Sequence, residues 1–129
     1  MIYGLGVDIQ GVTQISCMIE RLGERFLERV FTENEIAYCR KHLKAAQHFA
    51  ARWAVKEAFF KALGTGVANG YRLLDVELEH LPSGQPYLVF YGKVREDCAR
   101  FRLQPYVSLS HSEDYAVGQV ILISSQTRN

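Results

Sequence analysis

The sequence has few of the residues that mark special protein classes. Proline occurs 3 times, tryptophan once and cysteine 3 times in 129 residues, and no two cysteines form a CxxC pair. Because the count is odd, Cys17, Cys39 and Cys98 cannot all pair within the chain, so we expect a reducing, cytoplasmic setting. No apolar run approaches the roughly 18 residues of a membrane span. The N-terminus also lacks the basic and apolar regions of a signal peptide, so no membrane association is predicted.

An excess of charge of either sign is also missing. The 15 Lys and Arg residues against 14 Asp and Glu give a formal net charge of +1. A protein that binds nucleic acid by default needs a basic field to neutralise phosphates, so no nucleic-acid partner is predicted. The 48% hydrophobic content and the length predict one globular domain, which we place at 1–123, followed by a short tail at 124–129.

Helical patterns fill the first half of the chain and strand patterns the second, which predicts an α+β domain with a mostly antiparallel sheet. Thr32 to Glu35 has the form of a capping box, and Leu74, Val76 and Leu78 alternate with acidic residues. The expected strands are 2–9, a hairpin from 74–79 and 87–91, 107–110 and 115–123. The expected helices are 13–22, one from Glu33, one that begins between Ala45 and His48, and a short one through Val94, Cys98 and Phe101 that Pro105 ends.

The most informative stretch, 50–66, reads AARWAVKEAFFKALGTG. As a helix it is apolar on nearly every side, yet Glu57 and Lys61 lie together between two apolar surfaces, which suggests a lined cavity. The alternative is a helix-stabilising ion pair worth roughly 0.2–0.5 kcal/mol. The segment Gly64-Thr65-Gly66 is a helix stop, or a turn that lets a phosphate approach the backbone.

Three further groups are candidates for chemistry. Asp8 ends an apolar strand, where it either caps a turn or binds Mg²⁺ together with Glu57. Arg52 and Lys56 neutralise a bound pyrophosphate, or extend to solvent. Near the C-terminus, Ser110 and His111 hydrogen-bond phosphate or carrier groups, or are structural. Their pattern matches neither a hydrolase nucleophile nor a zinc motif.

Six blocks, in this order along the chain, resemble the holo-acyl-carrier-protein synthases, the short bacterial phosphopantetheinyl transferases. The blocks are GLGVDI (4–9), RFLERVFTENE (25–35), FAARWAVKEAFFKALGTG (49–66), DVEL (75–78), SGQPYL (83–88) and VSLSHSEDYAVGQVIL (107–122). The resemblance covers nearly the whole chain and is weakest over 10–24 and 92–105. It implies a homotrimer with active sites at the subunit interfaces.

The resemblance also implies roles for individual residues. Asp8 and Glu57 would bind Mg²⁺, and Lys61 would stabilise the transferring phosphate. The coenzyme A site would be lined by Arg52, Lys56, Gly64, Thr65, Gly66, Ser110 and His111, the last two supplied from a neighbouring subunit. A serine hydroxyl of apo acyl carrier protein would attack the β-phosphate of coenzyme A, and adenosine 3′,5′-bisphosphate would leave. The base is Glu57 or a metal-bound water, and we favour the water.

The sequence departs from the family pattern at three positions. Gly11, Gln14 and Tyr106 stand where many members carry Glu, Arg and His. The missing Arg weakens an expected charge contact with the carrier protein, whose binding surface we assign to Gln14, Met18, Arg21 and Arg25, with Arg29 as a further candidate cation. Two alternatives remain: the same reaction on a carrier of polyketide or peptide assembly, and a non-catalytic trimer that binds coenzyme A.

Overall fold

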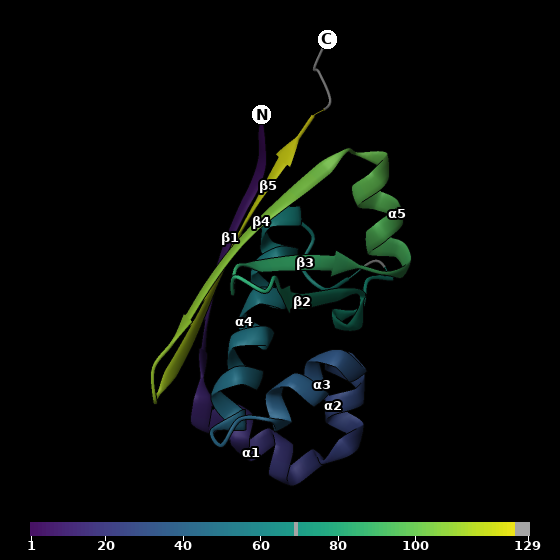
Figure 1. The fold of residues 1–129 in the computed structure, drawn as a ribbon. Helices are drawn as coiled ribbons and strands as arrows, with labels where there is room; N and C mark the ends of the chain where they lie inside the picture. The colour runs from purple at the N-terminus through teal and green to yellow at the C-terminus, as the bar shows by residue number, and fades with distance from the viewer. Residues whose placement is uncertain (69, 126–129) are drawn as a thin grey trace.

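A central helix, α4 (Ala45–Leu63), organises the fold of the computed structural model, which describes residues 1–68 and 70–125 (Figure 1). The element order confirms the predicted α+β class. The other helices are α1 (Val12–Leu22), α2 (Glu24–Val30), α3 (Glu33–Arg40), α5 (Gly92–Arg100) and the 3₁₀ turn η1 (Leu73–Asp75). The strands are β1 (Ile2–Gly11), β2 (Val76–His80), β3 (Pro86–Phe90), β4 (Leu103–His111) and β5 (Tyr115–Ser124).

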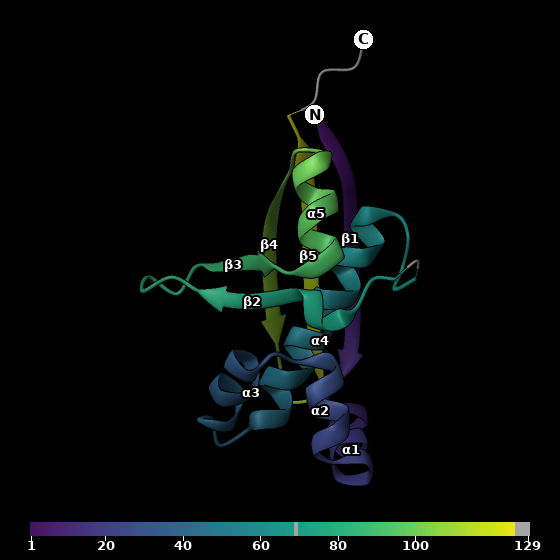
Figure 2. The same ribbon diagram turned by 90° about the vertical axis from the view of Figure 1, so that its right-hand side faces the viewer.

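The strands form two antiparallel sheets, one in the order β1-β5-β4 and one made of the β2–β3 hairpin. The three-stranded sheet packs one face on α4, while α1, α2 and α3 gather around the first half of that helix (Figure 1). The hairpin crosses α4 between α5 and these three helices (Figure 2). As a result α4 is covered on almost every side, as its all-round apolar sequence predicts.

Glycines bring the sheet unusually close to α4. A Cβ atom on Gly6 of β1 would lie 1.9 Å from the carbonyl oxygen of Ala58, and one on Gly118 of β5 would lie 2.5 Å from the backbone nitrogen of Val55. No side chain fits at such distances, so only glycine allows this contact. Gly118 is the cross-strand partner of Asp8, and the close approach therefore sets the depth of Asp8 against the helix.

Buried side chains form two apolar clusters along α4. One lies between its second half, the sheet, the hairpin and α5, and includes Phe59 and Phe60. The other lies between its first half and the helices α1 to α3, and includes Phe31 and Phe49. Five buried polar or charged residues are also part of the interior: Glu35, Arg52, Lys56, Asp75 and Glu77. The interior is therefore strongly polar beside the middle of α4.

Most of the predicted elements are confirmed, including the capping box, in which the Thr32 hydroxyl accepts from the Glu35 N–H and the Glu35 carboxylate accepts from the Thr32 N–H. Helix α2 was not predicted, although Phe26, Leu27 and Val30 have helical spacing and are buried. The prediction that Pro105 ends a helix is wrong. The helix ends at Arg100, and Pro105 lies in β4. This is an edge strand of the sheet, where a proline without an N–H is tolerated because one side of the strand has no partner.

The hairpin and the chain end also differ from expectation. Although acidic residues alternate with apolar ones over 74–79, Glu77 is as buried as Val76 and Leu78, because Thr32 and Asn34 at the start of α3 hydrogen-bond to its carboxylate. Ser124, which we predicted to lie in the C-terminal tail, belongs to β5, and its N–H donates to the Met1 carbonyl oxygen. The rest of the predicted tail, 126–129, lies outside the described part of the chain. Within the described residues, no helix is long and apolar enough to cross a membrane.

Candidate active site

Asp8, Glu57 and Lys61, here called the Asp8 cluster, meet where β1 crosses α4. Successive side chains alternate in a strand, so Asp8 lies on the same face of β1 as Gly6, the face against the helix. The Lys61 ammonium donates to Asp8 Oδ1 at 2.9 Å and to the Val7 carbonyl oxygen at 3.0 Å. Glu57 lies one turn before Lys61 on α4. Two segments about 50 residues apart in sequence thus bring two carboxylates and one ammonium group together.

The single positive charge of Lys61 does not fully offset the negative charges of Asp8 and Glu57. Burial raises the pKa of Glu57, the negative charge of Asp8 raises it further, and Lys61 opposes the shift. Asp8 is shielded from solvent, with 18% of its side chain exposed, whereas Lys61 is 53% exposed. Two neighbouring carboxylates that share one exposed cation repel each other, and a divalent cation between them would relieve that repulsion.

The donor set fits Mg²⁺. Two carboxylates are enough for this ion, which usually keeps several waters and takes further oxygens from substrate phosphates. Zinc requires three or four protein ligands, mostly nitrogen or sulfur. No group of three or more His, Cys, Asp or Glu side chains suited to a metal occurs in the described part of the chain. Asp8 and Glu57 are therefore suited to a magnesium site that a phosphate ligand completes.

The turn after α4 lies one helical turn beyond Lys61. Gly64 is left-handed, with φ 90° and ψ 5°, and its N–H donates to the carbonyl oxygens of Phe60 and Lys61. Gly66 also has a positive φ of 63°. No atom lies within 4 Å of a Cβ built on either glycine, so the turn is open on that side. This geometry serves as the helix stop and leaves room for a ligand beside the turn.

Lys56, a predicted coenzyme A contact, is not brought to the Asp8 cluster. Its side chain is 0% exposed, and its ammonium pairs with the equally buried Glu35 carboxylate at 2.7 Å. It also donates to the carbonyl oxygens of Leu73, at 3.0 Å, and Val76. Burial lowers the pKa of Lys56, and Glu35 opposes the shift. All three ammonium hydrogens are used, so Lys56 ties η1 and the hairpin to α4.

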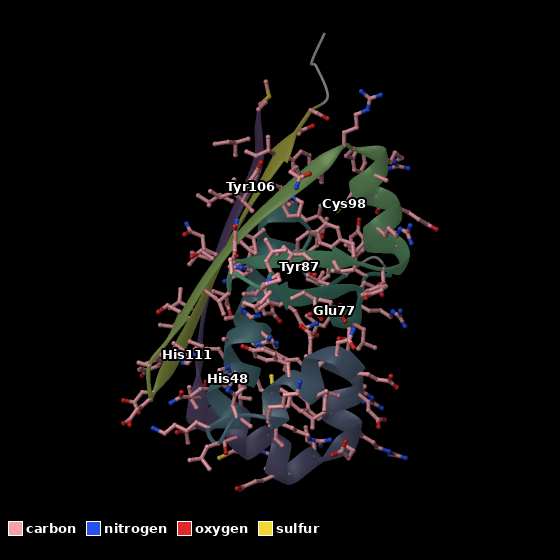
Figure 3. All side chains as sticks on the ribbon, in the orientation of Figure 1. His48, Glu77, Tyr87, Cys98, Tyr106 and His111 are labelled. Carbon is pink, nitrogen blue, oxygen red and sulfur yellow. The ribbon has the colours of Figure 1, made fainter. Side chains whose placement is uncertain are left out.

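Arg52 and His111 belong to a second cluster, beside the first half of α4. The Arg52 guanidinium lies over the ring of Tyr38, 4.1 Å from its centroid, and Arg52 is 2% exposed. His111, at the end of β4, lies beside His48 of α4 (Figure 3), with ring centroids 5.0 Å apart. We call Arg52, Tyr38 and the four histidines His42, His48, His80 and His111 the histidine cluster. Sequence reasoning missed Tyr38 and three of these histidines, because they come from separate elements and share no motif.

Ser110 and His111 are adjacent in sequence but lie on opposite faces of the sheet. His111 points to the α4 side, toward His48. Alternation places Ser110 on the outer face of the sheet. Tyr106 and Ser108, four and two residues earlier in β4, lie on the same face, and all three are exposed. Ser110 therefore cannot reach the Asp8 cluster of its own chain, which lies on the α4 face.

The outer face of the three-stranded sheet is apolar and exposed. Tyr3, Leu5, Val7 and Ile9 of β1 are between 44% and 63% exposed. Tyr106 of β4 and Tyr115 and Val117 of β5 extend the same face. Contiguous exposed apolar surface of this kind is typical of a protein–protein interface.

The predicted carrier-binding residues lie on α1 and α2. Gln14, Arg21 and Arg25 are exposed and Met18 is half-buried. Arg25 and Arg29 also line a groove of about 640 Å³ that extends to Val67, just after the Gly64–Gly66 turn. The basic side of α2 thus continues to the glycine turn.

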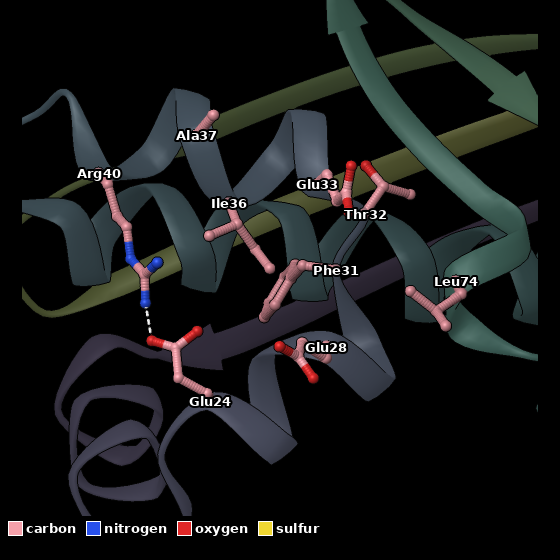
Figure 4. Close-up of a pocket in the computed structure, with 9 residues that line it drawn as sticks. All are labelled: Glu24, Glu28, Phe31, Thr32, Glu33, Ile36, Ala37, Arg40 and Leu74. Carbon is pink, nitrogen blue, oxygen red and sulfur yellow. Dashed lines mark hydrogen bonds and ion pairs between the residues drawn. The ribbon is translucent and has the colours of Figure 1, made fainter.

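A separate groove of about 460 Å³ runs between α2 and α3 (Figure 4). The Arg40–Glu24 ion pair spans it at one end, and Phe31, Ile36 and Leu74 provide apolar lining. None of the predicted site residues lines this groove. It is therefore distinct from both the Asp8 cluster and the histidine cluster.

Comparison with known proteins agrees with this geometry. The family model of the 4′-phosphopantetheinyl transferase superfamily matches residues 4–120. The chain belongs to this superfamily. The holo-[acyl-carrier-protein] synthase of Koribacter versatilis (strain Ellin345) is 44% identical over 123 residues, which cover 95% of this chain and 98% of that protein. The synthase of Geobacter metallireducens is 42% identical, with the same coverage.

Solved structures of superfamily members share the fold. The crystal structure of the Neisseria meningitidis synthase has a TM-score of 0.89 at 27% identity, covering 96% of this chain and 100% of that one. The Bacillus anthracis synthase, solved in complex with coenzyme A (3′,5′-ADP), has a TM-score of 0.80 at 34% identity, covering 97% and 99%. The predicted family and the predicted fold class are thus both confirmed.

Proposed function

We propose that this protein transfers the 4′-phosphopantetheine arm of coenzyme A to a serine of an apo acyl carrier protein of fatty acid synthesis, in a Mg²⁺-dependent reaction. The observation that carries this proposal is the meeting of Asp8 with Glu57 and Lys61 across β1 and α4. Binding alone would not need two carboxylates and an ammonium at one point. The names of the relatives and the coenzyme A complex of the Bacillus anthracis protein support the same reaction.

When bound between Asp8 and Glu57, Mg²⁺ would neutralise the pyrophosphate and the charge that grows on it. The chain's own part is orientation and charge. Lys61 is exposed enough to turn its ammonium from Asp8 to a phosphate oxygen, where it stabilises the leaving bisphosphate. We assign the serine proton to a water beside Glu57, because a carboxylate that ligates a cation is a weak base.

The coenzyme A site would extend from the Asp8 cluster along both ends of α4. Gly64, Thr65 and Gly66 form the open turn beyond Lys61, next to where the pyrophosphate would lie. Arg52 and His111 would hold a more distant part of the same molecule. Lys56 would act indirectly, because its ammonium is already occupied by Glu35 and two carbonyls.

We also propose a homotrimer formed through the outer face of the sheet. Its apolar side chains, such as Leu5 and Val7, would be buried between subunits. Ser110 lies on that face, so it would complete the site of a neighbouring copy. The carrier protein would dock on α1 and α2, at Gln14, Met18, Arg21 and Arg25. Coenzyme A and carrier proteins of fatty acid synthesis are available in the cytoplasm, where we place the protein.

Two alternatives follow from particular residues. Gly11 and Gln14 remove a charge contact and so favour a different carrier, from polyketide or peptide assembly. A coenzyme A-binding trimer without catalysis would use Arg52 and His111 but would have no need of Lys61. Transfer rates measured on several apo carrier proteins test the first alternative. Any transfer of phosphopantetheine to a carrier excludes the second.

Intact-protein mass spectrometry of apo carrier proteins, after incubation with this protein, coenzyme A and Mg²⁺, tests the proposal. We expect a gain equal to one phosphopantetheine arm, abolished by EDTA. Glu57→Ala should abolish the gain, and Glu113→Gln, an exposed glutamate outside the cluster, should not. No gain on any folded carrier would leave the binding-only alternative.

A further inference from the structure

A third groove, of about 470 Å³, lies between α5, β3 and the edge strand β4. We call it the α5 groove. Its apolar lining comes from Phe90, Cys98, Ala99, Leu103 and Ile123. The volume is within the range of small-molecule sites, about 300–1,000 Å³. None of the residues assigned to coenzyme A or to the carrier protein lines this groove, so it is separate from the proposed active site.

The cysteine of this lining is part of the apolar surface. Figure 3 shows Cys98 between α5 and the sheet, where it packs in the same buried cluster as Leu103. Burial raises the pKa of the Cys98 thiol to about 12, and the negative charge of Asp97 adds to the shift. The thiol is therefore uncharged at neutral pH and behaves as a small apolar group.

Both charged residues that line the groove are arginines. Arg95 of α5 and Arg102, just before β4, are exposed. Neither forms an ion pair with a carboxylate of the described residues, and none of the described lining residues is acidic. By contrast, the groove between α2 and α3 and the groove beside Arg25 both include glutamates. The α5 groove thus combines an apolar wall with positive charge that has no counter-charge in the groove.

The backbone at Arg102 is in a conformation that favours glycine. Arg102 follows the C-cap of α5 and has a φ of 53°, and among the described residues it is the only non-glycine with a positive φ. Helices commonly end with glycine in this region, as α4 does at Gly64. Strained backbone of this kind is found at ligand sites more often than elsewhere. Here it puts a guanidinium group beside an apolar groove.

We propose that the α5 groove binds a carboxylate with an unbranched apolar chain, its head on Arg95 and Arg102 and its chain along the apolar wall. Guanidinium groups bind carboxylates through paired, charge-assisted hydrogen bonds. A small anion such as phosphate would leave the wall unused, and an uncharged chain would leave the arginines without a counter-charge. The last carbonyl oxygens of α5, those of Asp97 and Ala99, already accept main-chain hydrogen bonds and so repel the anion less.

Chain length and charge give the ligand a signature. Each methylene that leaves water contributes about 0.8 kcal/mol, so decanoate should bind about fifteenfold more tightly than octanoate when both added methylenes are buried. Affinity should also fall as salt is added, because the two arginines are exposed. Decyltrimethylammonium has a chain of the same length and the opposite charge, so it should not compete.

Equilibrium dialysis of radiolabelled decanoate against the full chain tests the proposal, at neutral pH and below the concentration at which the carboxylate forms micelles. We expect saturable binding of one decanoate per chain. Coenzyme A with Mg²⁺ should not displace it, because the groove shares no residue with the Asp8 cluster.

Two variants locate the site. Arg102→Gly should weaken decanoate binding by about tenfold or more, because a hydrogen-bonded charge is lost. The same change relieves the left-handed backbone and should raise the melting temperature, so unfolding cannot explain the lost affinity. Ala99→Trp places a large side chain at an exposed helix position in the groove and should abolish binding.

The matched control is Arg100→Gln. It removes a cation at the same end of α5, but the Arg100 guanidinium lies over the ring of Phe101, 4.6 Å from its centroid, and does not line the groove. This variant should bind decanoate within about twofold of the unaltered protein, as expected for an exposed charge without direct contact.

Four results overturn the inference. The first is the absence of saturable binding, and the second is equal competition by decyltrimethylammonium. Binding that persists in folded Ala99→Trp would place the ligand on another apolar surface, such as the outer face of the sheet. Displacement by coenzyme A would place it in the proposed active site. A lower mass of Ala99→Trp in sedimentation would instead identify the groove as a contact between copies of the chain, which also contradicts the proposal.

Discussion

Replacing Lys56 by methionine separates the two roles that sequence and structure give this residue. If Lys56 contacts coenzyme A, its removal lowers the affinity for that ligand and leaves the stability of the fold unchanged. As the partner of Glu35, it would leave a buried carboxylate without a counter-charge, since both side chains are 0% exposed and 2.7 Å apart. Removing one partner of such a pair typically costs about 3–5 kcal/mol of unfolding free energy. The carbonyl oxygens of Leu73 and Val76 lose a donor as well.

A double variant tests whether the charge is the cause. Glu35→Gln keeps the shape of the side chain and carries no charge, and its one carbonyl oxygen can take the place of either Oε1, which accepts from the Thr32 N–H, or Oε2, which accepts from the Leu78 N–H. We expect Lys56→Met combined with Glu35→Gln to recover roughly 2 kcal/mol relative to Lys56→Met alone, a coupling within the range for residues in contact.

Urea unfolding followed by circular dichroism measures these differences. Lys61→Met is the matched control, because it removes the same group from the same helix at a site where the side chain is 53% exposed. It should cost less than about 1 kcal/mol and yet abolish transfer. A Lys56→Met protein as stable as the control, with weakened coenzyme A binding, would refute the structural role.

Four further outcomes are expected. Glu57→Gln should stabilise the metal-free protein at neutral pH, because it removes a carboxylate whose pKa is raised by burial and by Asp8, and it should abolish the rise in melting temperature on adding Mg²⁺. Gly6→Ala should cost about 1–3 kcal/mol in urea unfolding and slow transfer, because the methyl group forces β1 away from α4. Leu5→Glu should reduce the mass found by sedimentation to that of a monomer, and an unchanged trimer would contradict the proposed interface. Arg25→Glu should raise KM for the carrier protein several-fold without changing KM for coenzyme A, in steady-state kinetics; equal effects on both would return Arg25 to a solvent-exposed role.

Sequence alone predicted what depends on local patterns. The start of α4, its left-handed end at Gly64 and the capping box before α3 follow from residue types at fixed spacings, and all are present. The family resemblance placed Asp8, Glu57 and Lys61 in one site, and in the structure the Lys61 ammonium lies 2.9 Å from Asp8 Oδ1. Neither result required knowledge of how the elements pack.

What packing decides could not be read from the sequence. Lys56 and Lys61 belong to the same helix, but the hairpin covers one and leaves the other open, and no local pattern distinguishes them. The alternation over 74–79 does not distinguish Glu77, which is buried, from Glu79, which is half-buried. The histidine cluster depends on four elements that converge only in the folded chain, so sequence reasoning named Arg52 and His111 but missed Tyr38 and the other three histidines.

The contact between glycines and helix backbone has a consequence for how the protein can change. Gly6 and Gly118 fix the spacing of the sheet and α4 through main-chain atoms, which every substitution of the surrounding side chains leaves in place. The apolar residues on either side, such as Phe59 and Phe60, can therefore be exchanged for others of similar volume without moving Asp8 relative to Lys61. A redesign of this protein has wide freedom in its core and almost none at Gly4, Gly6 and Gly118, which have no side chain at all.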